Sequence, residues 1–443
     1  MELRDIVVTP LMIILVYVVA YAVRQRVTDS VNRRYFIPAL TVKILGAISV
    51  GIIYDYYYHG GDTFSYHKYG SRIIWEAFMD SPTDGFKLLL TDGSNTAGIY
   101  KYSSRILFFT DPSSYVIVRI AAILDLITFS TYSSTAVLFA VFSFAGMWLF
   151  FKAFYVRYPY LHRGLSIAAF FIPSVFFWGS GLLKDTITLG CLGMATYSIS
   201  TIFIEKKPSL GRFLLLAGSL LGLYFIKIYI LLTFLPAAII WIFTAQLPLM
   251  RSTIVKIMVF PFVIVLALAI SYYSVIAASE GNEKYAVNKL AKTAQITAYD
   301  IRYFTGRDAG SGYSLGELDG TFGSLMALAP QAINVSLFRP YLWEVSNAFM
   351  LLSALESLAL FMFFLYILIS QNVSIRKSFT QPDIFFCLIF SISFAFAVGV
   401  STFNFGTLAR YKIPLLPFFS IALLLMGGYS KRDRKLEELE ATE

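Results

Sequence analysis

Residues 55–69 hold two carboxylates, two of the chain's three histidines and five tyrosines, around a pair of glycines. Asp62 follows those glycines, which permit an unusual backbone. Its carboxylate could serve as a general base or a ligand for sugar hydroxyls, with tyrosine rings stacking on a pyranose face. If a helix starts just after Asp62, Tyr66 and His67 share its face. Alternatively, Asp62 caps a helix and the tyrosines form an aromatic belt. A divalent metal held by His59, Asp62 and His67 is a third interpretation.

Lys184 and Asp185 form a second polar cluster, after a glycine-containing stretch between two apolar runs. Charge near the membrane surface is expensive to leave unpaired and is often functional. The alternative is a lysine that extends to the interface and an aspartate that begins a helix. Lys227 is a lone cation between two further apolar runs, where it either meets a lipid phosphate or marks a turn.

A last cluster is divided between two segments that flank apolar runs late in the chain. Its polar members are Arg339, Glu344, Asn404, Arg410 and Lys412. If these segments face outward, their positive charge opposes the usual insertion bias and indicates an anionic ligand. Arginine suits phosphate because its planar fork forms bidentate hydrogen bonds, and Arg410 is the strongest cationic candidate.

The elements that must position these clusters are membrane helices. The chain is 57% hydrophobic and 14% charged, whereas soluble domains are about a quarter charged. Its long apolar runs predict a polytopic helical membrane protein, and they are continuous rather than alternating, which excludes a membrane β-barrel. The net charge of +9 fits the positive-inside rule, so we expect no nucleic-acid partner.

We predict an all-α transmembrane bundle of about eleven spans, at ~20 residues each, with interfacial helices in two long external loops. The predicted spans are 6–23, 37–54, 135–151, 165–178, 186–203, 213–225, 228–247, 257–277, 348–369, 384–402 and 413–426. One transmembrane domain then covers residues 1–430, with external loops at 55–134 and 278–345. Residues 431–443 form a charged cytoplasmic tail.

Residues 113–130 decide which clusters share a side of the membrane. They are apolar enough to cross, but they contain Arg119 and Asp125. If they cross, the basic loop at 152–163 and the later basic loops lie outside. If they form an interfacial helix, these loops all lie inside, as the positive-inside rule prefers. We therefore predict an interfacial helix, although a short re-entrant hairpin satisfies the rule equally, and all the polar clusters then face outward.

Four short motifs, at residues 61–66, 176–185, 338–344 and 404–411, carry a family resemblance. Together they resemble the GT-C superfamily of integral-membrane glycosyltransferases, especially bacterial members related to the dolichyl-phosphate-mannose protein mannosyltransferases. The resemblance implies that Asp62 activates an acceptor hydroxyl, while Lys184 and Arg410 contact the donor phosphate. The chain departs from the family pattern in having an extra span before the acidic loop.

The resemblance also implies the partners. They are a polyprenyl-phosphate-linked sugar, a glycan, lipid or protein acceptor, and the lipid bilayer, with the active site facing outward from a bacterial inner membrane. No Walker loop or dinucleotide fingerprint is present, so a lipid carrier is the simplest source of activated sugar. The sequence demands no cofactor, although a divalent metal is compatible with it. Two alternatives remain, namely a polymerase of lipid-linked polysaccharide repeat units and a non-enzymatic transporter of lipid-linked sugar.

Overall fold

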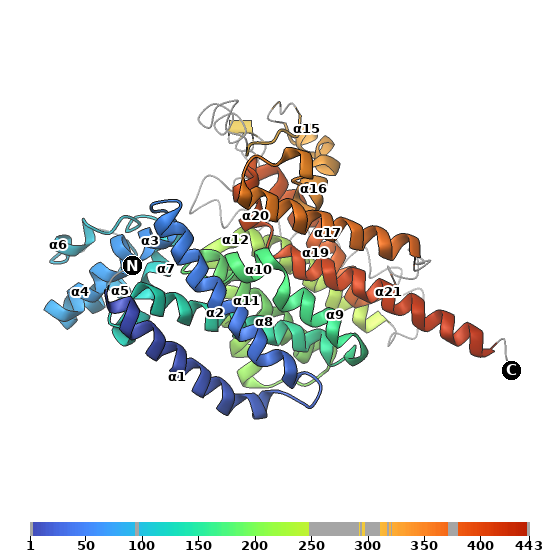
Figure 1. Cartoon of the computed structure of the whole chain (residues 1–443), viewed down its shortest axis with the longest axis horizontal. Coiled ribbons are helices and arrows are strands. Elements are labelled where there is room, and N and C mark those ends of the chain that lie inside the picture. Colours follow the sequence, from blue (N-terminus) through green and yellow to red (C-terminus); the bar gives the residue numbers. More distant parts are fainter. Residues whose placement is uncertain are drawn as a thin grey trace. The chain divides into compact units, whose positions relative to one another are not determined.

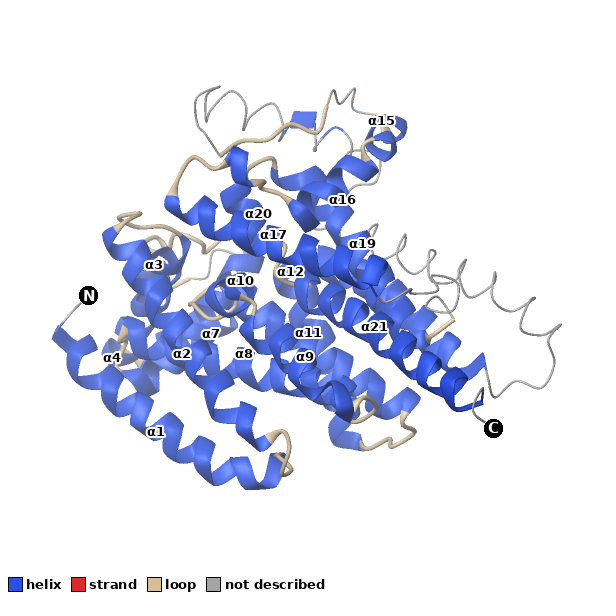
Figure 2. Cartoon of the chain, turned by 45° about the vertical axis from the view of Figure 1, so that its right-hand side comes forward, coloured by secondary structure: helices blue, strands red, loops and turns tan. Residues whose placement is uncertain are grey.

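The computed structural model describes residues 3–93, 97–247, 292, 295–296, 311–316, 319, 321–370 and 380–440. Every regular element in these ranges is a helix, and an isolated β-bridge joins Gly312 to Asn404 (Figures 1 and 2). The predicted all-α fold is therefore confirmed for this part of the chain. The predicted span at 257–277 lies outside the described residues.

Seven helices in the described ranges are long and apolar enough to cross a membrane. They are α1 (Leu3–Val27), α2 (Arg33–Tyr56), α8 (Tyr132–Tyr155), α11 (Lys184–Ile199, continued by the π-helix η4, Ser200–Ile204), α12 (Leu210–Gln246), α17 (Ala348–Ser370) and α19 (Pro382–Thr402). An eighth would combine α20 (Phe405–Tyr411) with the start of α21 (Leu415–Glu440), across a bend of 65°. The chain is thus a multi-pass membrane protein, whereas the expected count of about eleven spans is not confirmed.

Three predicted spans differ in detail from the helices observed. The segment 165–178 is divided into α9 (His162–Ser166), the π-helix η3 (Ile167–Phe171) and α10 (Pro173–Trp178). Proline disfavours helix at the residue before it and is well placed at a helix start, so Pro173 ends one piece and begins the next. The predicted spans 213–225 and 228–247 belong to α12, whose backbone leaves helical geometry at Lys227 (φ −145°, ψ 78°).

The chain divides into two compact units. Unit 1 contains Met1–Arg157, Ala169–Ser198 and Leu210–Lys227, and unit 2 contains Tyr158–Ala168, Ile199–Ser209 and Ile228–Glu443. In unit 1, α2 packs against α8 and α10, and α1 packs against α8. In unit 2, α19 packs against α21 and α16 (Ala329–Phe338), and α17 contacts α16 and α21.

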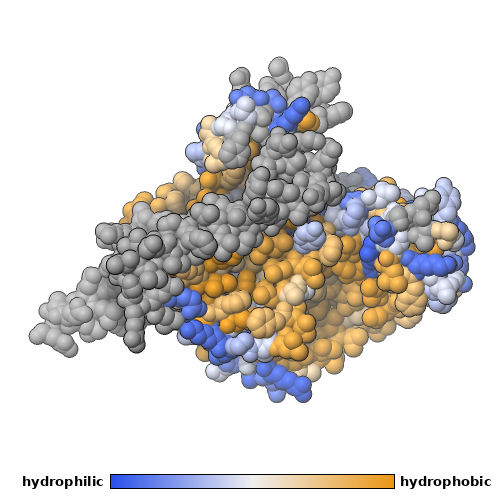
Figure 3. All heavy atoms as spheres, turned by 180° about the vertical axis from the view of Figure 1, so that it is seen from behind, coloured by the Kyte–Doolittle hydropathy of each residue, from blue (hydrophilic) through white to orange (hydrophobic). Residues whose placement is uncertain are grey.

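Small residues allow close helix packing inside unit 1. A side chain on Gly146 of α8 would collide with the backbone of Gly190 on α11, so the two helices approach as closely as their backbones allow. Such contacts are typical of membrane helices, which associate through close packing rather than through the hydrophobic effect. In contrast, α1 exposes apolar side chains such as Ile6, Leu11 and Val18. Figure 3 shows a broad hydrophobic surface with hydrophilic residues at its margins, as expected for helices that face lipid.

The first predicted external loop folds into short helices that all belong to unit 1. These are α3 (Asp62–Tyr66), the π-helix η1 (His67–Ser71), α4 (Arg72–Asp80), α5 (Pro82–Leu90), α6 (Tyr100–Ser103) and α7 (Pro112–Thr128). The last of these packs against α3, η1, α4 and α8. At 17 residues it is shorter than the seven span candidates, and its interfacial placement stays a prediction.

Candidate functional site

Lys184 lies at the centre of a charged cluster in unit 1, which we define as Asp62, Asp111, Lys184, Asp185 and Lys227. The Nζ of Lys184 donates a hydrogen bond of 2.7 Å to Ser113 Oγ and lies 3.6 Å from Asp111 Oδ2. Asp62 and Lys227 are near enough to influence the Lys184 charge electrostatically. Four predicted site residues, from three regions of the sequence, are therefore brought together around Lys184.

Asp185 and Lys227 form a buried ion pair within this cluster. The Nζ of Lys227 donates to Asp185 Oδ1 at 2.5 Å, and the side chains are only 7% and 2% exposed. Lys227 occupies the break in α12, while Asp185 lies in the first turn of α11. The predicted lone cation therefore has a partner. Removing one member of a buried pair is strongly destabilising, because the other charge is left uncompensated.

Asp111 belongs to the cluster but was not among the predicted site residues. It is the N-cap of α7, and its side chain accepts hydrogen bonds from Ser114 Oγ (2.5 Å) and the Ser113 backbone N–H (3.2 Å). Burial raises the pKa of the Asp111 carboxyl, but the bond from Ser114 and the charge of Lys184 outweigh it and hold the pKa below its usual value. The sequence signal was the Asp-Pro-Ser order, which is typical of a helix start.

Asp62 is exposed at the start of α3. The two preceding residues, Gly60 and Gly61, have φ values of 138° and 122°, which side-chain-bearing residues rarely adopt. Tyr66 and His67, which were predicted to share a helix face with Asp62, are buried, since they are only 3% and 2% exposed. The reason is that α3 and η1 pack on α7, which directs these two side chains into unit 1.

His67 instead joins a buried polar network. Its Nε2 lies 3.7 Å from Asp125 Oδ2, and its ring and that of Tyr132 meet in a T-shaped contact with centroids 5.6 Å apart. Asp125 Oδ1 also accepts a hydrogen bond of 2.6 Å from Thr135 Oγ1. Within the described residues, no group of three or more His, Cys, Asp or Glu side chains is arranged to hold a metal ion. The suggested set of His59, Asp62 and His67 is therefore not assembled.

In unit 2, Arg339 and Glu344 face each other rather than open space. The guanidinium of Arg339 donates to both carboxylate oxygens of Glu344 through Nε, at 3.0 Å each, and through a further contact from its NH2 group. Arg339 also lies over the rings of Tyr313, Tyr341 and Phe405, at 5.3–5.8 Å from their centroids. The fork that we expected to bind phosphate is occupied by an internal carboxylate.

The remaining predicted residues of unit 2 occupy or adjoin α20. Asn404 caps this helix, because its Oδ1 accepts hydrogen bonds from the backbone of Gly406 (2.8 Å) and Thr407 (3.2 Å). Lys412 is buried, and its Nζ donates to Ser357 Oγ (2.9 Å) and to the carbonyl of Arg339 (3.3 Å). Arg410 is partly exposed in the last turn of α20. Unit 2 thus brings Lys412 to the Arg339–Glu344 pair.

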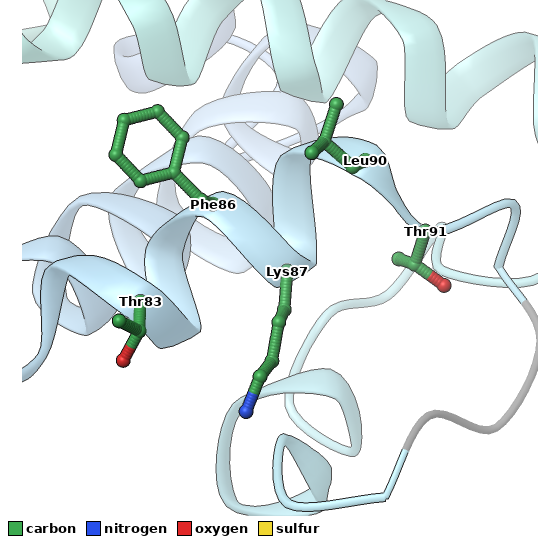
Figure 4. Close-up of a pocket in the computed structure, with 5 residues that line it drawn as sticks. All are labelled: Thr83, Phe86, Lys87, Leu90 and Thr91. Atoms are coloured by element: carbon green, nitrogen blue, oxygen red, sulfur yellow. The ribbon is translucent and has the colours of Figure 1, made fainter.

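A depression on α5 offers a further place for a ligand. It is lined by Thr83, Phe86, Lys87, Leu90 and Thr91, and Figure 4 shows that the first four side chains all project from this one helix. None of them belongs to the charged cluster, so we place the candidate site at the cluster. Comparisons with protein-family models, with curated proteins and with solved structures found no match.

Proposed function

We propose that the chain is a glycosyltransferase of GT-C type. It would move a sugar from a polyprenyl-phosphate donor to an acceptor on the outer face of a bacterial inner membrane. The observation that carries this proposal is the charged cluster of unit 1, where the Nζ of Lys184 lies 3.6 Å from Asp111 Oδ2 and the exposed Asp62 carboxylate is within electrostatic range of the Lys184 amine. Transfer from a lipid phosphate needs a base for the acceptor and a cation for the leaving group, and Asp62 and Lys184 supply these.

In this mechanism the Asp62 carboxylate accepts the proton of an acceptor hydroxyl as its oxygen attacks the anomeric carbon. The bond between the anomeric carbon and the phosphate oxygen breaks, and the electron pair leaves on the lipid phosphate. Lys184, which is 16% exposed, stabilises that developing negative charge. The buried Asp185–Lys227 pair holds the first turn of α11 and therefore the position of Lys184.

The test is sugar transfer by the purified protein in nanodiscs, with a polyprenyl-phosphate sugar as donor. General-base catalysis contributes roughly 10²–10⁴-fold, so Asp62→Asn is expected to lower the rate by about that factor. Asp84→Asn is the matched control, because it makes the same change in α5 of the same loop. If Asp62→Asn transferred sugar at the wild-type rate, Asp62 would not be the general base.

Transport of a lipid-linked sugar is the second candidate, and Lys43 favours it. This residue lies within α2, is fully buried, and places an ionisable amino group inside a membrane-spanning segment, as in many transport pathways. Proteoliposomes that contain labelled donor and no acceptor separate the two functions. Movement of label between leaflets without formation of a glycosidic bond would support transport. A polymerase differs from the transferase in donor and acceptor size, and lengthening of a glycan product would identify it.

A further inference from the structure

Four aromatic side chains of unit 1 make a continuous series of ring contacts. The ring centroids are 5.0 Å apart for Tyr57 and Tyr58, 5.2 Å for Tyr58 and Tyr54, and 6.3 Å for Tyr54 and Trp178. Tyr54 belongs to the last turns of α2, Tyr57 and Tyr58 follow that helix, and Trp178 ends α10. We call these four residues the aromatic track.

The track adjoins the candidate base. A Cβ added to Gly61 would lie 2.7 Å from Cε1 of Tyr54, so the Tyr54 ring packs directly on the backbone that precedes Asp62. Any other residue at position 61 would push this ring away. The order of contacts therefore runs from Tyr57 through Tyr58 to Tyr54, which lies beside the residue to which we assign proton abstraction.

The exposure of the rings leaves surface for a ligand. Tyr57 and Tyr58 are 56% and 48% exposed, and Tyr54 and Trp178 are partly exposed. The negatively charged face of an aromatic ring attracts the C–H groups on the apolar face of a pyranose, while a phenol hydroxyl can bond to sugar hydroxyls. The chain has 41 phenylalanines and 29 tyrosines, yet every aromatic residue in 54–58 is tyrosine. An isoprenoid chain has no polar group that could form a hydrogen bond with the tyrosine hydroxyl.

We propose that the aromatic track binds the sugar rings of a carbohydrate acceptor and leads its reactive hydroxyl to Asp62. The inference rests on the proposed function and deepens it, because it selects a glycan from among the acceptor classes. Tyr57 and Tyr58 contact the distal sugar, and Tyr54 and Trp178 contact the sugar nearest the reaction. The tyrosine hydroxyls orient these rings, and the ring faces supply the contact area.

The experiment measures binding of soluble oligosaccharides to the full chain in nanodiscs by saturation-transfer NMR, without donor. Tyr58→Ala is expected to weaken binding about three- to tenfold, whereas Tyr58→Phe keeps the stacking and loses less. Tyr100→Ala is the matched control, since Tyr100 is an exposed tyrosine of the same loop outside the track. In steady-state transfer, Tyr58→Ala should raise the acceptor KM by the same factor with little change in kcat.

Two results would overturn the proposal. One is equal oligosaccharide binding by Tyr58→Ala and Tyr100→Ala. The other is measured in a variant whose other four tryptophans are replaced by phenylalanine, so that Trp178 alone fluoresces. Strong quenching of this fluorescence by lipids brominated in the acyl chain would show that the aromatic track lies among lipid chains, as a membrane belt does. Because oligosaccharide binding is measured without donor, it tests the aromatic track independently of the role of Asp62 in the reaction. If Asp62→Asn transfers sugar normally while binding depends on Tyr58, the catalytic assignment fails and the track stands.

Discussion

The Nζ of Lys43 lies 2.8 Å from the carbonyl oxygen of Gly179, the residue that follows the last residue of α10. Lys43 also donates to the carbonyl of Val175 (3.2 Å) and to Ser143 Oγ (3.1 Å), and none of its surface is exposed. The last carbonyls of a helix lack partners within the helix, so a hydrogen-bond donor there is a favourable cap. Lys43 thereby fixes the turn that leads from α10 to Lys184.

Lys43→Met should therefore destabilise unit 1. Methionine has a similar length but cannot donate, so it leaves the two carbonyls and the serine without the donor that they share. The Val175 carbonyl keeps its backbone hydrogen bond from Gly179, so two groups are left unsatisfied. At about 1–3 kcal/mol for each buried group, we expect a total loss of about 2–6 kcal/mol. The measurement is the melting temperature in detergent. The control variant is Lys68→Met, which makes the same change at an exposed lysine. Equal melting temperatures for the two variants would contradict the capping role.

The Asp185–Lys227 pair predicts a strong coupling in a double-mutant cycle. Asp185→Asn and Lys227→Met each leave one buried charge without its partner, so each should lose about 3–5 kcal/mol of stability. The double variant removes both charges and should be more stable than the sum of the single losses predicts. Unfolding of the four proteins in the same detergent measures the coupling. Strictly additive losses would show that the two charges do not interact.

Glu344 predicts an acid-sensitive contribution to the stability of unit 2. Burial raises the pKa of its carboxyl, but the hydrogen bonds from Arg339 and from the Tyr341 backbone N–H, with the Arg339 charge, lower it below the ordinary 4.5. Because the folded-state pKa is the lower one, the stabilisation is complete above pH 4.5 and is lost as the pH falls below it.

The measurement is the melting temperature of wild type and Glu344→Gln between pH 7 and pH 3. Wild type should be the more stable protein at neutral pH, and the difference should shrink as the pH falls, because glutamine cannot titrate. A difference that is constant over this range would show that the Glu344 charge does not stabilise the fold.

Apolar run length was sufficient to predict the helices that became α1, α2, α8, α17 and α19, because a membrane span leaves a long continuous signal in the sequence. Hydropathy could not show the division of 165–178, because the effect of Pro173 is on the backbone. The partner of Lys227 could not be predicted from the sequence, for another reason. Asp185 is 42 positions away, and only the packing of α11 on α12 brings the two side chains together.

The candidate site shows the same limit. The types and local spacing of Asp62 and Lys184 were enough to select them as candidates, because charged residues are conspicuous in a chain that is only 14% charged. Side-chain direction was not predictable, since the burial of His67 depends on how η1 packs against α7. Arg339 was interpreted as a phosphate ligand because the sequence does not reveal that Glu344, five residues later, folds back onto its guanidinium.

Lys184 and Arg339 should therefore respond differently to substitution. Lys184→Gln removes a partly exposed cation from the charged cluster, and we expect roughly 10²-fold slower transfer with little change in melting temperature. Arg339→Lys keeps the charge but loses the bidentate fork, so it should lower stability by about 1–3 kcal/mol and leave the donor KM unchanged. Donor kinetics and thermal unfolding, measured on the same two preparations, provide the comparison. If Arg339→Lys had wild-type stability and a raised KM for the donor, the result would support a role for Arg339 in donor binding.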